Sequence, residues 1–439
     1  MTSPARNRRR AVEVPPLLEA FRADVEARAS RAGEPADLAR RRREASELLT
    51  REGFPHSGVE AYRFTDVRAV LAQPHRVVPP ARPELPGGNG GATSTLVLEN
   101  GLPTPLRPHE GRGLRLRWSG SPERADIAER LGELAPSDSA FVAQNTALFG
   151  EALLVEVEPG ARASLRTVTR ALASVSPVLA APRTLVVARE GSSLEWIDAL
   201  EGEPEAAHLS SGVTEIFVEA GARVEHVRVA ASGPRRADLT TIAARVATGG
   251  RYVSRLFSLG GALTRVDLRV ELRGEGASTV LDGLSLADSG ELVDHHTHVR
   301  HAAPGCTTEE LHKGIVSGQG HVVFDGVIHV AKGARGTVAH QQSRNLVLSR
   351  GGRVNTKPHL EIDHDDVKCS HGATVGRLDP AQLFYLRARG LPEAEARATL
   401  VLAFAREMVE RIPDRRLGDE LGRRVAARLP GGTLALEAL

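Results

Sequence analysis

Cys369 and His371 are the two residues of this sequence whose types and spacing point most specifically to a chemistry. Cys369 is one of two cysteines in 439 residues, and an imidazole follows it two positions later. In an extended strand, residues i and i+2 project from the same face. A thiolate and an imidazole on one face can bind a soft metal ion or an iron-sulfur species, but a tetrahedral site needs about four ligands. The pair therefore predicts a shared site whose other ligands come from elsewhere, for example from a second chain.

The neighbours of Cys369 bear on its reactivity. Lys368 and His371 are expected to lower the pKa of the thiol, which favours the thiolate that binds metal. A buried thiol beside a hydrogen-bonded imidazole gives the same sequence pattern, so Cys-x-His alone does not decide between the two interpretations. The other cysteine, Cys306, lies in a turn-like setting. It is expected to pack as an inert side chain.

A second group of candidate ligands lies between Asp294 and His301, a run that contains four histidines. His295 and His301 are the metal-ligand candidates, and Asp294 is placed to orient an imidazole. Alternation along a strand divides the four histidines between two faces. This favours the interpretation in which some of them are solvated and others are hydrogen-bonded inside a stack of strands.

Motifs for other chemistries are missing from the sequence. No Ser-His-Asp or Cys-His-Asn arrangement can be recognised by spacing, and no P-loop occurs, so we expect no catalytic residues and no ATP hydrolysis by this chain. The net charge of +2, from 57 basic and 55 acidic residues, argues against nucleic acid as a partner. No apolar run approaches about 18 residues and no secretory signal begins the chain, which predicts a cytoplasmic protein without a membrane partner.

The elements that must position the candidate ligands are strands. From about residue 151 to 376, segments of alternating polarity recur, for example Leu153–Val157 and Val224–Val229. Glycine turns separate them, and each glycine is expected to adopt a positive φ. The turns are Glu158–Arg162, Glu219–Arg223 and Ala331–Arg335, with related turns at Gly249-Gly250 and Gly351-Gly352. Aromatic residues make up only 3% of the chain, so Val, Leu and Ala must fill the core. The pattern favours a β-helix or β-solenoid over a sandwich.

Helical regions are expected on both sides of the strands, and the predicted domains are 1–135, 136–376 and 377–439. In the first domain, residues 14–72 show helical spacing, residues 74–93 are a Pro- and Gly-rich linker, and a short helix begins at Pro122 and ends at Leu134.

The last domain is predicted to contain three helices. Asp379 and Asp414 are expected to cap two of them, and Pro392 begins the one between. An apolar stripe is expected to pack on the β core and is formed by Leu400, Phe404, Met408 and Ile412.

The order of the motifs between about residues 290 and 412 resembles the SufB/SufD family of iron-sulfur cluster assembly proteins. The motifs are Leu311–Ser317, Val323–Gly326, His340–Gln342, Asn345-Leu346, Lys357–Ile362, Asp365–Gly376 and Leu383–Gly390. The similarity is diffuse from 140 to 290, and Gly58–Thr65 matches a phrase of the family only faintly. The Lys-Cys-Ser-His phrase at 368–371 is similar to the SufD branch, whereas the SufB branch carries further cysteines upstream.

The resemblance implies a mainly β protein, with a right-handed parallel β-helix between N-terminal and C-terminal helical regions. It implies a heterodimer with a SufB-like subunit through the β-helix edge, and docking of a SufC-like ATPase on the C-terminal helices. It assigns His371, with Cys369 as the neighbouring thiol, to a transient iron-sulfur cluster shared with the partner subunit.

The function that follows is that of a non-catalytic scaffold in a SufBCD-type complex. The alternative is a β-helix enzyme that acts on polysaccharide. The sequence does not decide the stoichiometry of the complex or whether a flavin binds.

Overall fold

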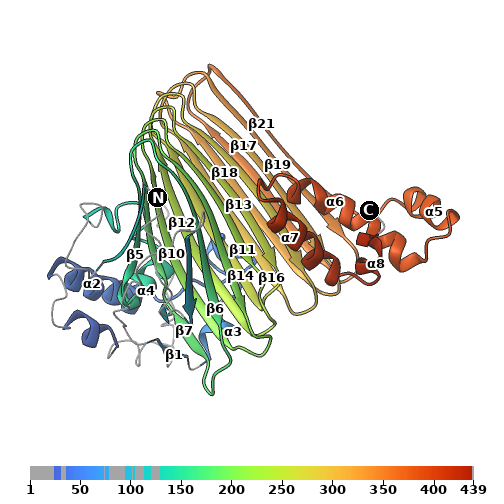
Figure 1. Ribbon diagram of the computed structural model, residues 1–439, viewed down its shortest axis with the longest axis horizontal. Helices are drawn as coiled ribbons and strands as arrows, with labels where there is room; N and C mark the ends of the chain where they lie inside the picture. Colours follow the sequence, from blue (N-terminus) through green and yellow to red (C-terminus); the bar gives the residue numbers. More distant parts are fainter. Residues whose placement is uncertain are drawn as a thin grey trace, which may run out of the picture.

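Two long β-sheets, wound from one continuous chain, form the body of the protein. The computed structural model describes residues 24–30, 36–73, 75–78, 94–100, 102–103, 113–119 and 129–437. Successive strands alternate between an 11-stranded sheet and a 10-stranded sheet, here called sheet A and sheet B. Strands two apart in the sequence pair in parallel, as β10 does with β12 and β11 with β13. The expected parallel β-solenoid is therefore confirmed (Figure 1).

The two sheets differ in which strands they collect. Sheet A contains β1 (Arg76–Val77), β4 (Leu114–Trp118), β5 (Ala152–Val157), β7 (Val178–Ala180), β8 (Arg183–Ala188), β10 (His208–Val218), β12 (Arg236–Val246), β14 (Leu263–Leu272), β16 (Leu292–His301), β18 (His321–Val330) and β20 (Arg353–Ile362). Sheet B contains β2 (Ser94–Glu99), β3 (Leu102–Pro103), β6 (Arg162–Ala171), β9 (Ser193–Gly202), β11 (Arg223–Ala230), β13 (Arg251–Leu259), β15 (Ser278–Ala287), β17 (Thr307–Val316), β19 (Thr337–Val347) and β21 (Val367–Gly376). Strands of both sheets thus lie N-terminal of residue 136, where the β-helix domain was expected to begin.

Glycines stabilise one turn of each coil of the solenoid. Gly160, Gly221 and Gly249 have φ values of 68°, 63° and 61°, as predicted for these turns. The backbone N–H of each donates to a carbonyl in the turn of the next coil, as Gly221 does to Thr248 O at 2.9 Å. The left-handed conformation directs the N–H along the solenoid axis. Only glycine adopts this conformation without strain.

The prediction of positive φ is wrong for the turns that contain Gly333 and Gly351-Gly352. In the first of them the left-handed residue is Gly336, with φ 67°, whose N–H donates to Asp366 O at 2.8 Å. The left-handed residue is therefore the one whose N–H continues the row of hydrogen bonds between turns. Gly333, which matches the glycine of the earlier turns in sequence, is not that residue.

The space between the sheets is filled as the scarcity of aromatic residues predicts. One elongated cluster of buried residues joins both sheets and consists mostly of Val, Leu, Ala and Ile, with three aromatic side chains at Trp118, Trp196 and Tyr252. Because each coil stacks on the next in register, similar small volumes recur along the axis. Cys306 belongs to this cluster and is fully buried, in agreement with its expected packing role.

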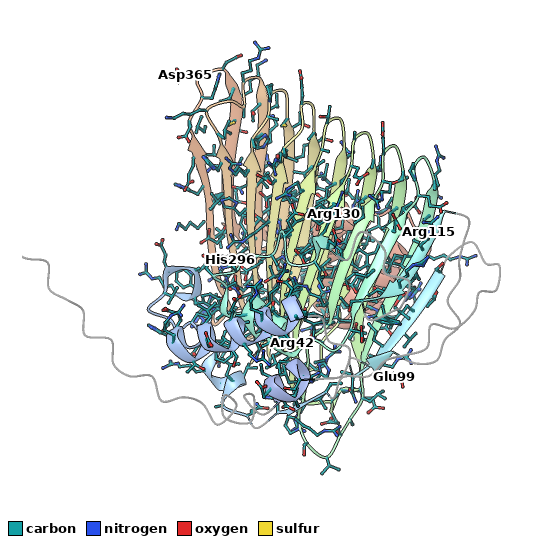
Figure 2. The ribbon with its side chains drawn as sticks, turned by 90° about the vertical axis from the view of Figure 1, so that its left-hand side faces the viewer. Arg42, Glu99, Arg115, Arg130, His296 and Asp365 are labelled. Carbon is teal, nitrogen blue, oxygen red and sulfur yellow. The ribbon has the colours of Figure 1, made fainter. Side chains whose placement is uncertain are left out.

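Helices near the N-terminus cover the outer face of sheet A. They are α2 (Ala36–Glu52), η1 (Glu60–Tyr62), α3 (Arg68–Leu71) and α4 (Ala140–Leu148). Their apolar residues join Leu209, Leu239 and Leu263 of sheet A in a second core. Figure 2 shows these helices in front of the sheet, with Arg42 on α2. Residues 14–23, 31–35, 79–93 and 122–128 of the predicted helices and linker lie outside the described residues, and 129–134 contain no α-helix.

Four helices follow β21, and three of them cover the outer face of sheet B (Figure 1). They are α5 (Pro380–Ala388), α6 (Glu393–Val409), α7 (Arg415–Ala427) and α8 (Gly432–Glu437). The predicted caps are confirmed, because the Asp379 carboxylate accepts from Ala381 N–H and that of Asp414 from Arg416 and Leu417 N–H.

The apolar stripe predicted for α6 is partly wrong. Met408 and Ile412 are buried against sheet B as expected, but Leu400 and Phe404 are only half-buried. The centre of the contact is formed by smaller residues around Val401 and Ala405, since close approach of a helix to a sheet favours short side chains.

Candidate functional site

The last coil of the solenoid, formed by β20 and β21, is open to solvent. In the described chain, β20 pairs only with β18 and β21 only with β19, so each has one unpaired edge. The change along one column of inward-facing residues is large. His301 and Val330 are 0% exposed, whereas Ile362, the next residue in register, is 44% exposed. The interior of the solenoid therefore ends at a solvent-facing coil.

Cys369 and His371 lie on β21, in this open coil. Cys369 pairs in register with Ala339 and packs against the main core, and His371 pairs in register with Gln341. Both therefore project from the inner face of β21, as their spacing predicted, while Lys368 has the opposite parity. Cys369 is half-buried and His371 is exposed.

The expected lowering of the Cys369 pKa is wrong. Burial raises the pKa of the thiol, and a hydrogen bond with the backbone of Ala339 only partly offsets this. The positive charge of Lys368 is on the outer face of the strand and does not compensate for the lost hydration. The thiol of the isolated chain is therefore protonated at neutral pH, and a metal that binds it must displace the proton.

A column of buried polar side chains leads inward from His371 along sheet B. Gln341 and Glu310 occupy the next two positions in register, on β19 and β17. Gln341 Nε2 donates to Glu310 Oε2 at 2.7 Å, and Thr297 Oγ1 donates to Glu310 Oε1 at 2.6 Å. His312 Nε2 lies 3.3 Å from Glu310 Oε1. The candidate ligand thus continues a polar interior.

His295 and His301 lie on the inner face of β16 and are fully buried. His295 Nε2 is 2.8 Å from the Ser258 hydroxyl, and His301 Nε2 is 2.7 Å from the Thr308 hydroxyl. Burial lowers the pKa of His295 to about 3 and that of His301 to about 4, so both rings are neutral at pH 7. This agrees with the interpretation of hydrogen-bonded histidines inside a β-stack. A metal-ligand role for either stays a prediction.

Asp294 does orient an imidazole, but that of His296 on the outer face of β16. The Asp294 carboxylate is buried, lies 2.9 Å from His296 Nε2 and also contacts Arg265 and Thr65. Burial opposes the charged form, but Arg265 and His296 lower the pKa of Asp294 well below its usual range. Because Thr65 belongs to the N-terminal region, this charged cluster fastens that region to sheet A.

Within the described residues, no group of three or more His, Cys, Asp or Glu side chains is arranged to hold a metal ion. A metal site that includes Cys369 and His371 therefore needs ligands beyond those that the described residues bring together. The same part of the chain contains no helix long and apolar enough to cross a membrane.

The sequence matches known iron-sulfur cluster assembly proteins. Residues 168–404 match the family model "SUF system FeS cluster assembly, SufBD core domain". The chain is 36% identical over 243 residues to the iron-sulfur cluster assembly protein SufD of Escherichia coli. The aligned residues cover 55% of this chain and 57% of that protein. The chain belongs to the SufBD family. The predicted family and its SufD-like character are therefore confirmed.

Two further relatives show how far the similarity to the SufBD family extends. A SufBD family protein of Synechocystis is 28% identical over 417 residues, which covers 89% of this chain and 91% of that protein. One of Mycobacterium tuberculosis is 30% identical over 295 residues, covering 64% and 72%. Membership of this family supports a role in iron-sulfur cluster assembly, and it favours that role over the polysaccharide enzyme.

The buried polar column beside His371 in this SufBD protein was not predicted from the sequence. A usable signal was present, because three strand glycines face polar side chains, two of them on the adjacent strand and one on the opposite sheet. A Cβ atom at each glycine would lie 2.2 or 2.3 Å from a side-chain nitrogen or oxygen, which no real Cβ atom tolerates. The pairs are Gly283 with His312, Gly314 with Asn345, and Gly326 with Gln341. Glycine inside a strand marks such a close approach.

Proposed function

We propose that this chain is a non-catalytic scaffold subunit of a SufBCD-type complex, in which it supplies part of the ligand set for a nascent iron-sulfur cluster. The observation that supports this most is the open last coil, with Cys369 and His371 on its inner face. A donor pair that is incomplete within one chain and lies at an unpaired edge suits completion by a second chain.

The proposed partner at this edge is a SufB-like subunit. Both edge strands have 10 residues, and their unpaired N–H and C=O groups form a template for further strands. Inward-facing apolar residues are exposed at this end, namely Ile362 at 44% and Val375 at 53%. A partner that stacks on the coil would bury them, and its own thiolates or carboxylates would complete the site.

The cluster is the cargo of this site. Cys369 would contribute a thiolate after the incoming iron displaces its proton to water or to a basic group of the partner, and His371 would contribute an unprotonated ring nitrogen. Because burial raises the Cys369 pKa, the thiol stays protonated until metal arrives. Both cysteines are free, which fits a reducing compartment such as the cytoplasm.

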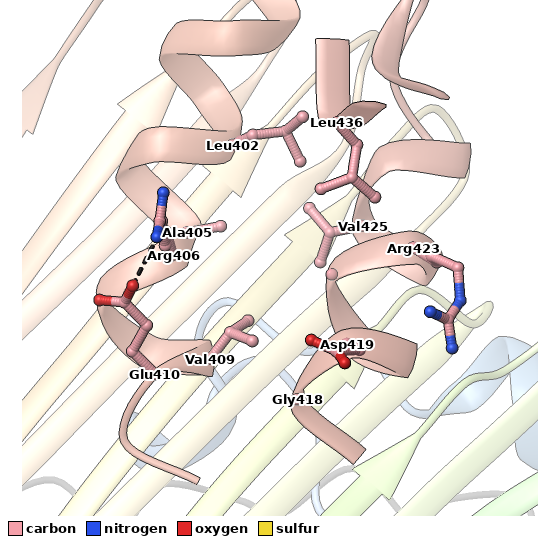
Figure 3. A pocket seen from close by; sticks show the side chains of 11 residues that line it. Leu402, Ala405, Arg406, Val409, Glu410, Gly418, Asp419, Arg423, Val425 and Leu436 are labelled. Atoms are coloured by element: carbon pink, nitrogen blue, oxygen red, sulfur yellow. Dashed lines mark hydrogen bonds and ion pairs between the residues drawn. The ribbon is translucent and has the colours of Figure 1, made fainter. Parts of the chain in front are cut away.

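The C-terminal helices are the proposed docking surface for a SufC-like ATPase. A groove of about 390 Å³ between α6 and α7 is lined by Leu402, Val409 and Val425 (Figure 3). Charged groups form its rim, including an Arg406–Glu410 ion pair of 2.6 Å. An apolar floor with a charged rim is the usual composition of a protein-protein interface.

The docking proposal has a direct test at Gly422. A Cβ atom at Gly422 meets nothing within 4 Å, so Gly422→Trp fills the groove without a clash at the Cβ position. We expect this variant to lose co-purification with the ATPase subunit. Arg416→Trp, on the exposed side of the same helix, is the control and should retain it. Equal ATPase recovery from both variants would place the docking site elsewhere.

The scaffold function is tested by cluster reconstitution in the assembled complex. His371→Ala is expected to lower the yield of iron-sulfur cluster at least roughly 10-fold, since one ligand of the shared set is lost. His340→Ala is the matched control, because His340 lies on the neighbouring strand but on the outer face, where its Nδ1 is 2.7 Å from the Ser370 hydroxyl. Undiminished yield with His371→Ala would remove this residue from the function.

A further inference from the structure

Gln341 is the buried residue next to the proposed ligand, and its amide group has one satisfied and one unsatisfied atom. Its Nε2 donates to Glu310 at 2.7 Å, but its Oε1 is buried and has no hydrogen-bond partner among the described residues. A buried acceptor without a donor destabilises the folded chain, because it has lost its hydrogen bonds to water. The structure therefore contains an acceptor that lacks a donor directly beside the open coil.

The orientation of this amide is fixed on two sides. Glu310 carries a carboxylate, which accepts hydrogen bonds, and this selects the NH₂ side of the Gln341 amide. Gly326 of the opposite sheet makes room for the same group, since a Cβ atom there would lie 2.3 Å from Gln341 Nε2. Because the two polar atoms of an amide lie on different sides, a nitrogen directed at β17 leaves the oxygen away from that strand.

The donor in the right place is the ring of His371. His371 is in register with Gln341 on the adjacent strand, and in-register side chains on one face lie about 4.8 Å apart. An imidazole N–H at that separation can reach the oxygen by rotation of the exposed ring. Histidines that bind metals usually donate their second ring N–H to an acceptor of this kind.

We propose that Gln341 is a positioning residue for His371: its side-chain oxygen accepts the N–H of the His371 ring and so presents the other, unprotonated nitrogen at the open coil. Glu310 and Thr297 act one step further inward, by holding the amide of Gln341. The inference rests on the proposed function only in the use of that nitrogen as a ligand to iron. The proposed hydrogen bond needs rotation of the His371 ring and no partner or cluster.

The test is a measurement of the His371 tautomer in the full chain, labelled with ¹⁵N-histidine and without metal. Long-range ¹H–¹⁵N spectra at a pH where the ring is neutral distinguish a protonated nitrogen from a bare one, and His371→Ala assigns the signals. We expect one tautomer in the wild type. Gln341→Met should give averaged nitrogen shifts, since it keeps the volume and removes the acceptor.

The matched control is Gln342→Met, one residue further along β19 and on the outer face, where its side chain accepts from Arg344 at 2.7 Å. It should leave the His371 signals unchanged. If Gln341→Met does not fold, Gly326→Ala displaces the same amide from the opposite sheet and should have the same effect on the tautomer. Averaged shifts in the wild type, or shifts that neither variant changes, would overturn the proposal.

The two hypotheses fail in different experiments. A fixed tautomer in the wild type, together with full cluster yield from His371→Ala, would contradict the proposed function and leave the hydrogen bond standing. An averaged tautomer together with loss of yield in His371→Ala would refute the role of Gln341 and keep His371 as a ligand. If both hold, Gln341→Met should lower the cluster yield less than His371→Ala does.

Discussion

The two ends of the solenoid differ in how their edge strands are paired. At the first end, β2 and β5 each pair with a short antiparallel strand, β3 and β4 respectively, and the inward residues Leu114, Leu116 and Trp118 of β4 are buried. At the last end, two strands of 10 residues each have an unpaired edge within the described chain. Figure 2 shows these ends on opposite sides, with Arg115 near the first and Asp365 near the last. Since the fold can shorten and reverse an edge strand, the two long unpaired edges at the last end support the proposal that a second chain binds there.

The largest expected effect comes from a charge at the open end. Val375→Asp should weaken binding to a SufB-like subunit at least about 30-fold, because a carboxylate would be buried without a partner in the interface. Its melting temperature should stay near that of the wild type, since Val375 is already 53% exposed. Val175→Asp, at a valine that is fully exposed, is the control for the added charge. Equal dissociation constants for the two variants would show that the open coil is not the binding surface for the SufB-like subunit.

A smaller effect is expected when the same Gly→Ala substitution is made in a closed coil and in the open coil and the free energies of unfolding are compared. At Gly283 a Cβ atom would lie 2.2 Å from His312 Nδ1, whereas at Gly372 it meets nothing within 4 Å. Gly283→Ala should therefore lower the free energy of unfolding by about 2 kcal/mol, and Gly372→Ala should change it by less than about 0.5 kcal/mol. Urea unfolding of the two variants measures this difference. Similar losses at both positions would mean that the outer face of β21 at Gly372 is as closely packed as the interior at Gly283.

The smallest effect is a pH dependence that originates in the closed coils. Burial lowers the pKa of His301 to about 4, so the unfolded chain binds the proton more tightly and stability falls as the pH drops below about 6.5. Between pH 7 and pH 5 we expect this residue to contribute roughly 1–2 kcal/mol of destabilisation. Aspartates whose pKa is lowered, such as Asp294, lose their contribution only in stronger acid.

The measurement is the difference in unfolding free energy between pH 7 and pH 5. His301→Gln keeps a hydrogen-bonding group beside Thr308 and removes the titration, so its difference should be smaller than that of the wild type. His340→Gln, which removes an exposed histidine, is the control. An unchanged difference in His301→Gln would mean that this ring is not held neutral by burial.

The sequence predicted the architecture because solenoids repeat their signals. Each coil repeats alternating strands and a glycine turn and contains few aromatic residues. An error in one turn or strand therefore does not change the conclusion. The caps Asp379 and Asp414 were also local signals. The failures were non-local: Gly336 replaced Gly333 because a hydrogen bond to the next coil selects the left-handed residue, and short side chains displaced Leu400 and Phe404 from the centre of the α6 contact.

The candidate site was predicted in its spacing but not in its surroundings. Two-residue periodicity was enough to place Cys369 and His371 on one face. The pKa of Cys369 moved in the opposite direction because burial raises it, and the hydrogen bond with the backbone of Ala339, a residue 30 positions earlier, offsets this only in part. Glu310 and Gln341 were missed for the same reason, since only the register of three strands brings them into line with His371.

The most direct test of the central claim is whether His371 touches the cluster. In a reconstituted complex in which only this chain carries ¹⁵N-histidine, the reduced, paramagnetic cluster should show hyperfine coupling to a ¹⁵N nucleus. We expect this coupling to be present in the wild type and in His340→Ala and absent in His371→Ala. A cluster that forms without any ¹⁵N coupling from this chain, or a coupling that persists in His371→Ala, would contradict it.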